Sequence, residues 1–225
     1  MRKHIYILSI LGLMLSFYSC EKETEGISRI TYYTDLQLKG APEMSIKQGE
    51  SYVEPGYTAI ENEVDVSDKV EVKGNVNSNT PGVYRLIYQA INVDGFVKNV
   101  ERLVVVVPTN VSTIDLSGNY KGQRSGQPES EGACEIISLS NGAFKATDFF
   151  GGFYNLVRGY GPAYRLLTYF YLTTDNEIVA LSTNSPWGPW EIHNGKYVPE
   201  TGVFTHTVFQ DGFAFNVTLT KELDK

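Results

Sequence analysis

The chain has 225 residues, of which 42% are hydrophobic and 12% aromatic, and it carries a formal net charge of −7. This length supports one or two domains, and the apolar fraction is large enough to build their cores. An acidic surface repels phosphate backbones, which excludes nucleic acid as an expected partner.

The first segment has the layout of an export signal. A positively charged start, MRK, leads into an apolar run, Ile5–Phe17, which ends shortly before Ser19 and Cys20. The run is shorter than the roughly 20 apolar residues of a membrane-spanning helix, so we interpret it as a cleaved signal. With a small residue before a cysteine, the segment resembles a bacterial lipoprotein signal.

That resemblance implies that Cys20 is acylated and becomes the new N-terminus; the alternative is an ordinary signal that happens to contain a cysteine. We expect residues 1–19 to be the signal peptide and residues 20–29 a polar tether. The sequence after the cysteine, EKETE, resembles the acidic signal that sends such lipoproteins to the cell surface. The expected location is the outer membrane, with a lipid anchor and exposure at the surface.

Residues 30–109 have the pattern of a small antiparallel β-sandwich. Short runs rich in β-formers alternate with turn residues: Val83–Tyr88 is a strand candidate, Asp94-Gly95 a hairpin turn, and Leu103–Val107 a continuous apolar strand. We count six or seven such strands and no convincing helical period, which favours a sandwich.

The same region resembles the bacterial surface immunoglobulin-like (Ig-like) domain. The resemblance covers residues 36–107 and rests on residues in a fixed order: Gly49, Tyr52, Pro55-Gly56, Ala59, Val70, Val72, Gly74, Thr80-Pro81-Gly82, Tyr84, Tyr88, Ala90, Asp94-Gly95, Arg102 and Val104. It implies a spacer or adhesion module without catalysis. At Val93 and Phe96 the chain departs from the family, which often has a more polar turn there.

A linker rich in small polar residues, Pro108–Asp115, precedes a second domain at 114–225. Its strand candidates are longer and more aromatic: Cys134–Leu139, Tyr164–Thr173, and a hairpin of Val203–Phe209 with Phe213–Thr220. One face of the last strand is apolar and the other polar, as a closed or half-closed meander requires. We therefore predict an all-β chain with an antiparallel, barrel-like second domain that folds separately from the first.

Two short motifs in this domain also resemble known families. The opening at Leu116 (LSGNYKG) and the ending from Gly195 to Leu219 resemble the C-terminal β-domain of small lipoproteins from Bacteroides-type bacteria, often encoded beside glycan-uptake systems. The opening is also similar to the start of lipocalin barrels, with Tyr120 in place of tryptophan. This second resemblance implies a lipocalin-like barrel.

No catalytic motif stands out. His193 and His206 belong to no closely spaced ligand pair, and Cys134 lies mid-strand, where a buried, inert role is expected. We expect no enzyme, no cofactor and no metal. The alternative is a glycan hydrolase that uses two carboxylates, whose candidates are Glu129, Glu131, Asp148, Asp175, Glu177 and Glu191.

Aromatic residues in Gly- and Pro-rich loops are the stronger signal. Trp187 and Trp190 flank Gly188-Pro189, while Tyr160 and Tyr164 flank a second such stretch. Rings beside amide and hydroxyl groups suit carbohydrate, because sugar C–H faces stack on rings while polar groups bind hydroxyls. We predict a glycan-binding surface from these four residues; the alternative is that the rings plug the end of the barrel.

These observations predict a non-catalytic surface lipoprotein. An Ig-like spacer presents a β-domain that binds a glycan or a partner, such as an outer-membrane transport protein of a glycan-uptake system. The alternatives are a lipocalin-like carrier of a small ligand and the hydrolase.

Overall fold

The computed structural model describes residues 30–127 and 131–222, and residues 33–225 form one compact unit. The predicted signal peptide and Cys20 lie outside the described residues. Among the residues that are described, no helix has the length and hydrophobicity needed to cross a membrane.

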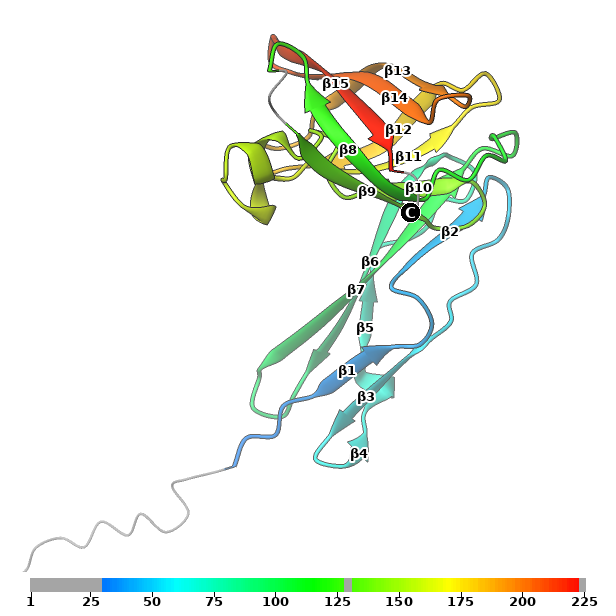
Figure 1. The fold of residues 1–225 in the computed structure, drawn as a ribbon. Helices are drawn as coiled ribbons and strands as arrows, with labels where there is room; N and C mark the ends of the chain where they lie inside the picture. The colour runs from blue at the N-terminus through cyan, green and yellow to red at the C-terminus, as the bar shows by residue number, and fades with distance from the viewer. Residues whose placement is uncertain (1–29, 128–130, 223–225) are drawn as a thin grey trace, which may run out of the picture. The chain divides into compact units, whose positions relative to one another are not determined.

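The Ig-like domain is a β-sandwich of two sheets, with strand orders β1-β3-β4 and β2-β7-β6-β5 (Figure 1). Its elements are β1 (Asp35–Leu38), β2 (Glu43–Lys47), β3 (Tyr57–Glu61), β4 (Val64–Asp65), the 3₁₀ turn η1 (Ser67–Lys69), β5 (Glu71–Lys73), β6 (Gly82–Ile91) and β7 (Val97–Val107). The core between the sheets includes Leu36, Ala59, Leu86, Tyr88 and Ala90. The predicted sandwich is confirmed, and so is a hairpin turn at Asp94-Gly95 between β6 and β7.

One pairing differs from the antiparallel pattern that we expected. β2 runs parallel to β7, with Glu43 opposite Leu103. The chain leaves β1, which pairs antiparallel with β3, and crosses to the other sheet through Gly40 and Pro42. Gly40 has φ of 74°, a conformation that glycine adopts without a steric penalty.

A buried arginine forms an ion pair within this sandwich. Arg102 is 0% exposed; its Nη2 donates to Glu54 Oε1 at 3.1 Å and its Nη1 donates to the Ala41 carbonyl at 2.6 Å. The hydroxyls of Tyr52 and Tyr88 both donate to the Glu54 carboxylate. Tyr52, Tyr88 and Arg102 belong to the motif on which the resemblance to the Ig-like domain rests, so part of that motif encodes a polar network.

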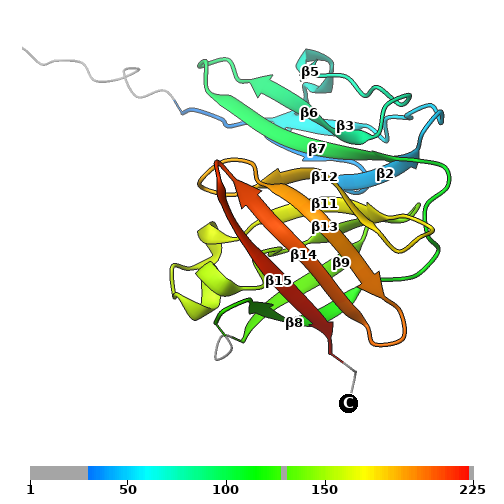
Figure 2. The ribbon, with the colours of Figure 1, turned by 90° about the horizontal axis from the view of Figure 1, so that it is seen from above.

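The second domain is an eight-stranded antiparallel sheet with the order β12-β11-β10-β9-β8-β15-β14-β13. Its strands are β8 (Gly118–Arg124), β9 (Gly132–Ser138), β10 (Ala143–Ala146), β11 (Leu167–Leu172), β12 (Ile178–Asn184), β13 (Glu191–Val198), β14 (Val203–Gln210) and β15 (Phe213–Lys221). The sheet curls until its end strands approach each other (Figure 2), and the backbones of Glu177 and Lys196 form an isolated antiparallel β-bridge there. The predicted barrel-like domain is confirmed.

Large side chains fill the interior of this barrel. They include Tyr120, Ile136, Phe144, Phe149, Phe170, Phe204, Val217 and Leu219. The interior of a small barrel packed in this way is a core rather than a ligand cavity. This packing disfavours the lipocalin-like carrier.

The hairpin predicted from Val203–Phe209 and Phe213–Thr220 is present as β14 and β15, which are joined by Asp211-Gly212. Both residues have positive φ, 49° and 83°, as a two-residue turn of type I′ requires. Cys134 is buried mid-strand, as expected. The strand predicted from Tyr164 begins instead at Leu167, because Tyr164 ends a short 3₁₀ turn.

The Ig-like domain and the barrel share contacts. Lys145 Nζ donates to Glu43 Oε1 at 2.6 Å, and the Tyr169 hydroxyl donates to the same oxygen at 2.9 Å. Val105 and Val107 belong to a small apolar cluster with Tyr169. Separate folding of the two halves therefore stays a prediction, and these contacts are what each half would lose.

Candidate functional site

A long loop between β10 and β11, residues 148–166, carries most of the aromatic residues at one end of the barrel. Asp148 closes its base: Oδ1 accepts the backbone N–H of Phe150 at 3.0 Å and that of Leu166 at 3.1 Å. The Phe149 N–H also donates to the Leu166 carbonyl at 2.8 Å. The two ends of the loop are thus joined at one buried carboxylate.

Glycines let this loop lie directly on the barrel wall. A Cβ on Gly122 of β8 would come within 2.2 Å of the Gly151 carbonyl oxygen, and one on Gly132 of β9 within 2.0 Å. A Cβ on Gly152 would meet the Ala133 nitrogen at 2.4 Å. The sequence FFGGFY, residues 149–154, therefore encodes close packing of backbone on backbone.

Two short turns shape the rest of the loop, the π-type turn η2 (Phe153–Val157) and the 3₁₀ turn η3 (Pro162–Tyr164). The buried Asn155 joins them. Its amide oxygen faces the Arg165 guanidinium and accepts from Nε at 2.9 Å, and its amide nitrogen donates to the Gly161 carbonyl at 3.2 Å. The loop is consequently held by its own polar contacts.

The loop between β12 and β13, which carries Trp187, is braced in a similar way. Ser185 Oγ donates to the Gly188 carbonyl at 2.8 Å and accepts the Trp187 N–H at 3.2 Å. From β14, Gln210 Nε2 donates to the carbonyls of Trp187 and Pro189 at 2.8 and 2.9 Å. These bonds hold the Trp187 backbone in place.

The two loops bring four rings together in what we call the aromatic platform, formed by Tyr154, Tyr160, Tyr164 and Trp187. The Trp187 centroid lies 4.8 Å from that of Tyr154 and 5.2 Å from that of Tyr164, and Tyr160 lies 5.3 Å from Tyr164. Tyr160 is 54% exposed and Trp187 41%. Three of the four residues predicted from the sequence are thus neighbours at the surface.

The fourth predicted residue, Trp190, lies below the platform. It is 7% exposed and packs edge-on against Phe150 at 4.9 Å. Phe150 also contacts Tyr154 and Trp187, at 5.1 and 6.1 Å. Trp190 therefore belongs to the layer that supports the platform, in keeping with the alternative that some rings plug the barrel end.

Tyr154 is a platform residue that is not among the four predicted from the sequence. It lies in the aromatic-rich stretch FFGGFY. Nothing in the sequence indicates that this segment folds back toward Trp187, since that approach depends on the glycine contacts with β8 and β9.

A groove of about 550 Å³ runs beside the platform, between η3 and the loop that carries Trp187. Its polar lining is Lys145, Thr147, Arg165, Asn184 and Ser185. An aromatic surface next to amide, hydroxyl and cationic groups is suited to a ligand with both apolar faces and many hydroxyls.

Burial shifts the titration of three groups in the barrel. It raises the pKa of the Asp148 carboxyl to about 6, lowers that of His206 to about 4, and raises that of the Cys134 thiol to about 12. His206 Nε2 lies 2.8 Å from the Phe149 carbonyl, which only accepts, so Nε2 carries the hydrogen. A neutral thiol of this kind is a poor nucleophile.

Among the described residues, none of the carboxylates proposed for hydrolysis lines the groove beside the platform. Asp148 is buried and engaged with backbone N–H groups. Glu191 Oε2 lies 2.8 Å from His193 Nε2 on β13. The backbone of Glu177 forms a β-bridge with that of Lys196 where the sheet closes, and Glu129 lies outside the described residues.

Comparisons with known proteins place both domains. A family model described as "Bacterial surface protein, Ig-like domain" matches residues 36–106. A second family model, described only as a C-terminal domain, matches residues 109–221. No curated protein matches the sequence. The Ig-like match coincides closely with the range expected from the sequence.

Among solved structures, the lipoprotein BT2262 from Bacteroides thetaiotaomicron is 32% identical, with a TM-score of 0.50. The match covers 84% of the present chain and 100% of BT2262.

Two structures of ZmpB from Clostridium perfringens also match. One contains CBM51-2 in complex with GlcNAc and INT domains, at 11% identity over 84% of this chain and 43% of that one. The other contains the M60 catalytic domain with CBM51-1 and CBM51-2, at 12% identity over 86% of this chain and 21% of that one. Their TM-scores are both 0.31, so neither bears on the fold or function described here. The chain, an Ig-like domain followed by a barrel-like C-terminal domain, belongs to the family of the Bacteroides lipoprotein BT2262.

Proposed function

We propose that the chain is a non-catalytic, lipid-anchored surface protein whose aromatic platform binds glycan. The observation that carries this proposal is the meeting of Tyr154, Tyr160, Tyr164 and Trp187 from two braced loops, with Tyr160 and Trp187 about half exposed. Rings of this kind offer apolar faces on which the C–H faces of a sugar stack.

The groove beside the platform supports the same ligand class. Asn184 and Ser185 supply amide and hydroxyl groups along its wall, and Arg165 supplies a cation held by Asn155. Sugar hydroxyls that lie across the groove would hydrogen-bond to these groups while a pyranose ring stacks on Trp187. Because both loops are braced before binding, little conformational entropy is lost when a ligand binds.

A partner protein is the second candidate for the same surface. Leu156 and Val157 on η2 are exposed, and aliphatic side chains of this kind do not stack on sugars as rings do. An exposed apolar patch beside the platform favours a protein contact, for example with an outer-membrane transport protein.

A glycan array tests the first candidate. The chain from residue 21 is applied to the array, which is read both for bound protein and for cleaved glycan. Binding without cleavage supports the proposal, whereas cleavage would favour the hydrolase. If no glycan on the array binds the chain, a partner protein becomes the favoured ligand of the platform, and cross-linking in the native membrane would identify it.

Attachment to the outer membrane rests on the sequence around Cys20 and agrees with membership of a family that contains a lipoprotein. Replacing Cys20 by Ser should release the chain or leave its signal uncut, because the acylated atom is the cysteine sulfur. A Cys20→Ser variant that is processed and still fractionates with membranes would contradict the lipid anchor.

A further inference from the structure

The turn between β6 and β7 is apolar at a position where the resemblance to the Ig-like family leads us to expect a polar turn. Val93 is 74% exposed and Phe96 50%, and the flanking Ile91 and Val97 are exposed as well. Contiguous exposed apolar side chains of this kind mark interaction sites. The glycan-binding proposal makes no use of them.

This turn is built to hold its apolar side chains outward. The buried Asn92 side chain accepts the backbone N–H groups of Asp94 at 3.1 Å and Phe96 at 2.7 Å. The Asn92 N–H donates to the Phe96 carbonyl at 3.0 Å. These bonds fix the turn with Val93 and Phe96 exposed to solvent. The turn therefore loses little conformational entropy when another surface binds it.

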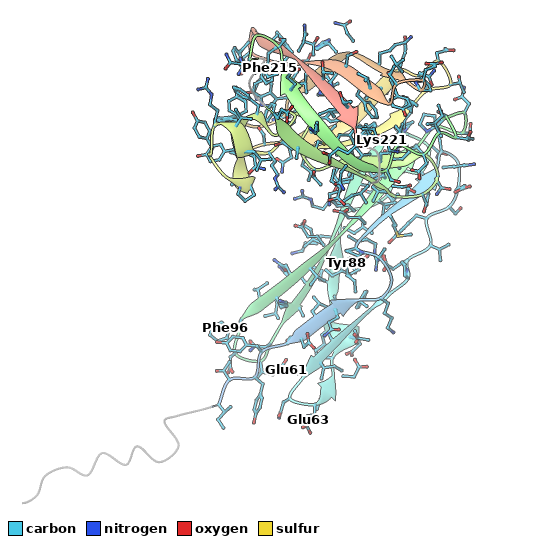
Figure 3. All side chains as sticks on the ribbon, viewed as in Figure 1. Glu61, Glu63, Tyr88, Phe96, Phe215 and Lys221 are labelled. Atoms are coloured by element: carbon cyan, nitrogen blue, oxygen red, sulfur yellow. The ribbon has the colours of Figure 1, made fainter. Side chains whose placement is uncertain are left out.

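Tyr33 packs against the same turn. The compact unit begins at Tyr33, whose ring lies 5.2 Å from that of Phe96. The Val93 N–H donates to Glu61 Oε1 at 3.2 Å, which fastens the turn to the end of β3. Figure 3 shows Phe96 and Glu61 at the same end of the Ig-like domain.

The distance along the chain to the proposed anchor is short. Twelve residues lie between Cys20 and Tyr33, so the extended chain from one to the other spans at most about 45 Å. An anchor this close raises the effective concentration of the bilayer at the turn to the millimolar range. Contacts too weak to bind a free protein to lipid are then sufficient.

We propose that Tyr33, Val93 and Phe96, which we call the hairpin tip, rest on the lipid bilayer to which the chain is attached. The inference rests on the anchor proposed at Cys20. It adds a second contact that sets the orientation of the Ig-like domain on the membrane.

The carboxylates next to the hairpin tip indicate which kind of bilayer it can contact. Glu61, Glu63 and Asp94 lie on or next to the β3–β4 and β6–β7 turns. Carboxylates there repel anionic lipid and tolerate zwitterionic headgroups. The hairpin tip therefore fits a zwitterionic interface, and added anionic lipid should weaken its contact.

An environment-sensitive fluorophore at the tip tests the proposal. A chain from residue 21 with an N-terminal histidine tag carries Val93→Cys, labelled with a nitrobenzoxadiazole dye; Cys134 is buried and does not compete. The tag holds the protein on phosphatidylcholine–phosphatidylethanolamine vesicles through a nickel-chelating lipid. Val53→Cys is the matched control, because Val53 is 75% exposed but lies in the loop between β2 and β3.

We expect the probe at residue 93 to shift to the blue and brighten several-fold on the vesicles, with no change at residue 53. Phosphatidylglycerol in the vesicles should reduce this response. An unchanged signal at residue 93 would overturn the proposal in favour of a protein contact, and equal changes at both positions would show unspecific adsorption. The tag replaces the lipid, so this result is independent of acylation, which intact mass measurement of the membrane-extracted chain reports separately.

Discussion

The indole of Trp187 packs edge-on against the phenol ring of Tyr154, with centroids 4.8 Å apart, although the two residues come from loops on different hairpins. Each ring fixes one side of the other, a contact worth about 1 kcal/mol beyond area burial. The platform therefore exists as a surface before any ligand arrives. Its precision depends on the contacts at the base of each loop, above all on Asp148.

Acid should act on Asp148 and His206 in opposite directions. The folded-state pKa of Asp148, about 6, lies above its ordinary value of about 3.9, so its contribution to stability rises as pH falls from 6 toward 4. The folded-state pKa of His206, about 4, lies below its ordinary value of about 6.5, so the stability that it contributes above pH 6.5 is lost over the same interval. Each effect amounts to about 3 kcal/mol.

The two single variants should separate these effects. Asp148→Asn should make the free energy of unfolding fall more steeply than in the native chain between pH 6.5 and 4, because His206 then acts alone. His206→Gln, which keeps an N–H for the Phe149 carbonyl, should change the slope in the opposite sense. Urea unfolding at a series of pH values measures both, and profiles parallel to that of the native chain would refute the assignment.

Arg102 should be a main support of the Ig-like domain. Arg102→Ala removes a fully buried guanidinium that donates to the carbonyls of Ala41 and Lys39 and to the partly exposed Glu54 carboxylate, and hydrogen bonds to a charged group contribute about 1.5–3 kcal/mol. Arg85→Ala is the matched control, because Arg85 lies on the same hairpin and pairs with Glu101 at the surface, at 3.6 Å. An exposed pair is worth below about 1 kcal/mol. Equal losses of stability in the two variants would argue against a structural role for the buried network.

The two halves should fold alone. Residues 29–109 and 114–225 each contain a complete sheet system and an apolar cluster of their own, so each should give a cooperative thermal transition. Each should melt below the full chain, because the contacts of Glu43 with Lys145 and Tyr169 are lost. A half without a cooperative transition would mean that the core extends across residues 109–114.

Much of the fold follows from the sequence, because its signals are local. Asp211-Gly212 gives the turn, and alternation along β15 places Phe215, Val217 and Leu219 in the core. Other features depend on tertiary contacts that alternation does not encode. The parallel pairing of β2 with β7 follows from a crossing between sheets, and β10 is only four residues long.

Part of the candidate site could also be predicted from the sequence. Loop composition identified Tyr160, Tyr164 and Trp187, which do meet at the surface. It did not separate Trp187 from Trp190, because two indoles around the same Gly-Pro turn differ only in which side of the barrel end they face. Whether a ring lies on the surface or beneath it depends on the packing of Phe150, a residue distant in sequence.

The different positions of Trp187 and Trp190 predict unequal effects of their substitution on stability. Trp190→Ala should lower the free energy of unfolding by about 3–5 kcal/mol, because it removes a large ring from the core. Trp190→Phe should lower the free energy of unfolding by less, since the Trp190 Nε1–H that it removes has no acceptor among the described residues. Trp187→Ala should change stability by about 1 kcal/mol. If urea unfolding ranks Trp187→Ala as the more damaging variant, the division into platform and supporting layer is wrong.

The central claim is that the aromatic platform binds glycan by stacking. Calorimetric titration of the strongest array ligand into the native chain, Trp187→Ala and Tyr160→Ala tests it most directly, with Phe96→Ala as a matched control because Phe96 is a half-exposed ring on the Ig-like domain. We predict at least a roughly fivefold loss of affinity in each platform variant, as expected for about 1 kcal/mol of stacking, and no change in Phe96→Ala. Native affinity in Trp187→Ala and Tyr160→Ala, with both variants fully folded, would contradict the account.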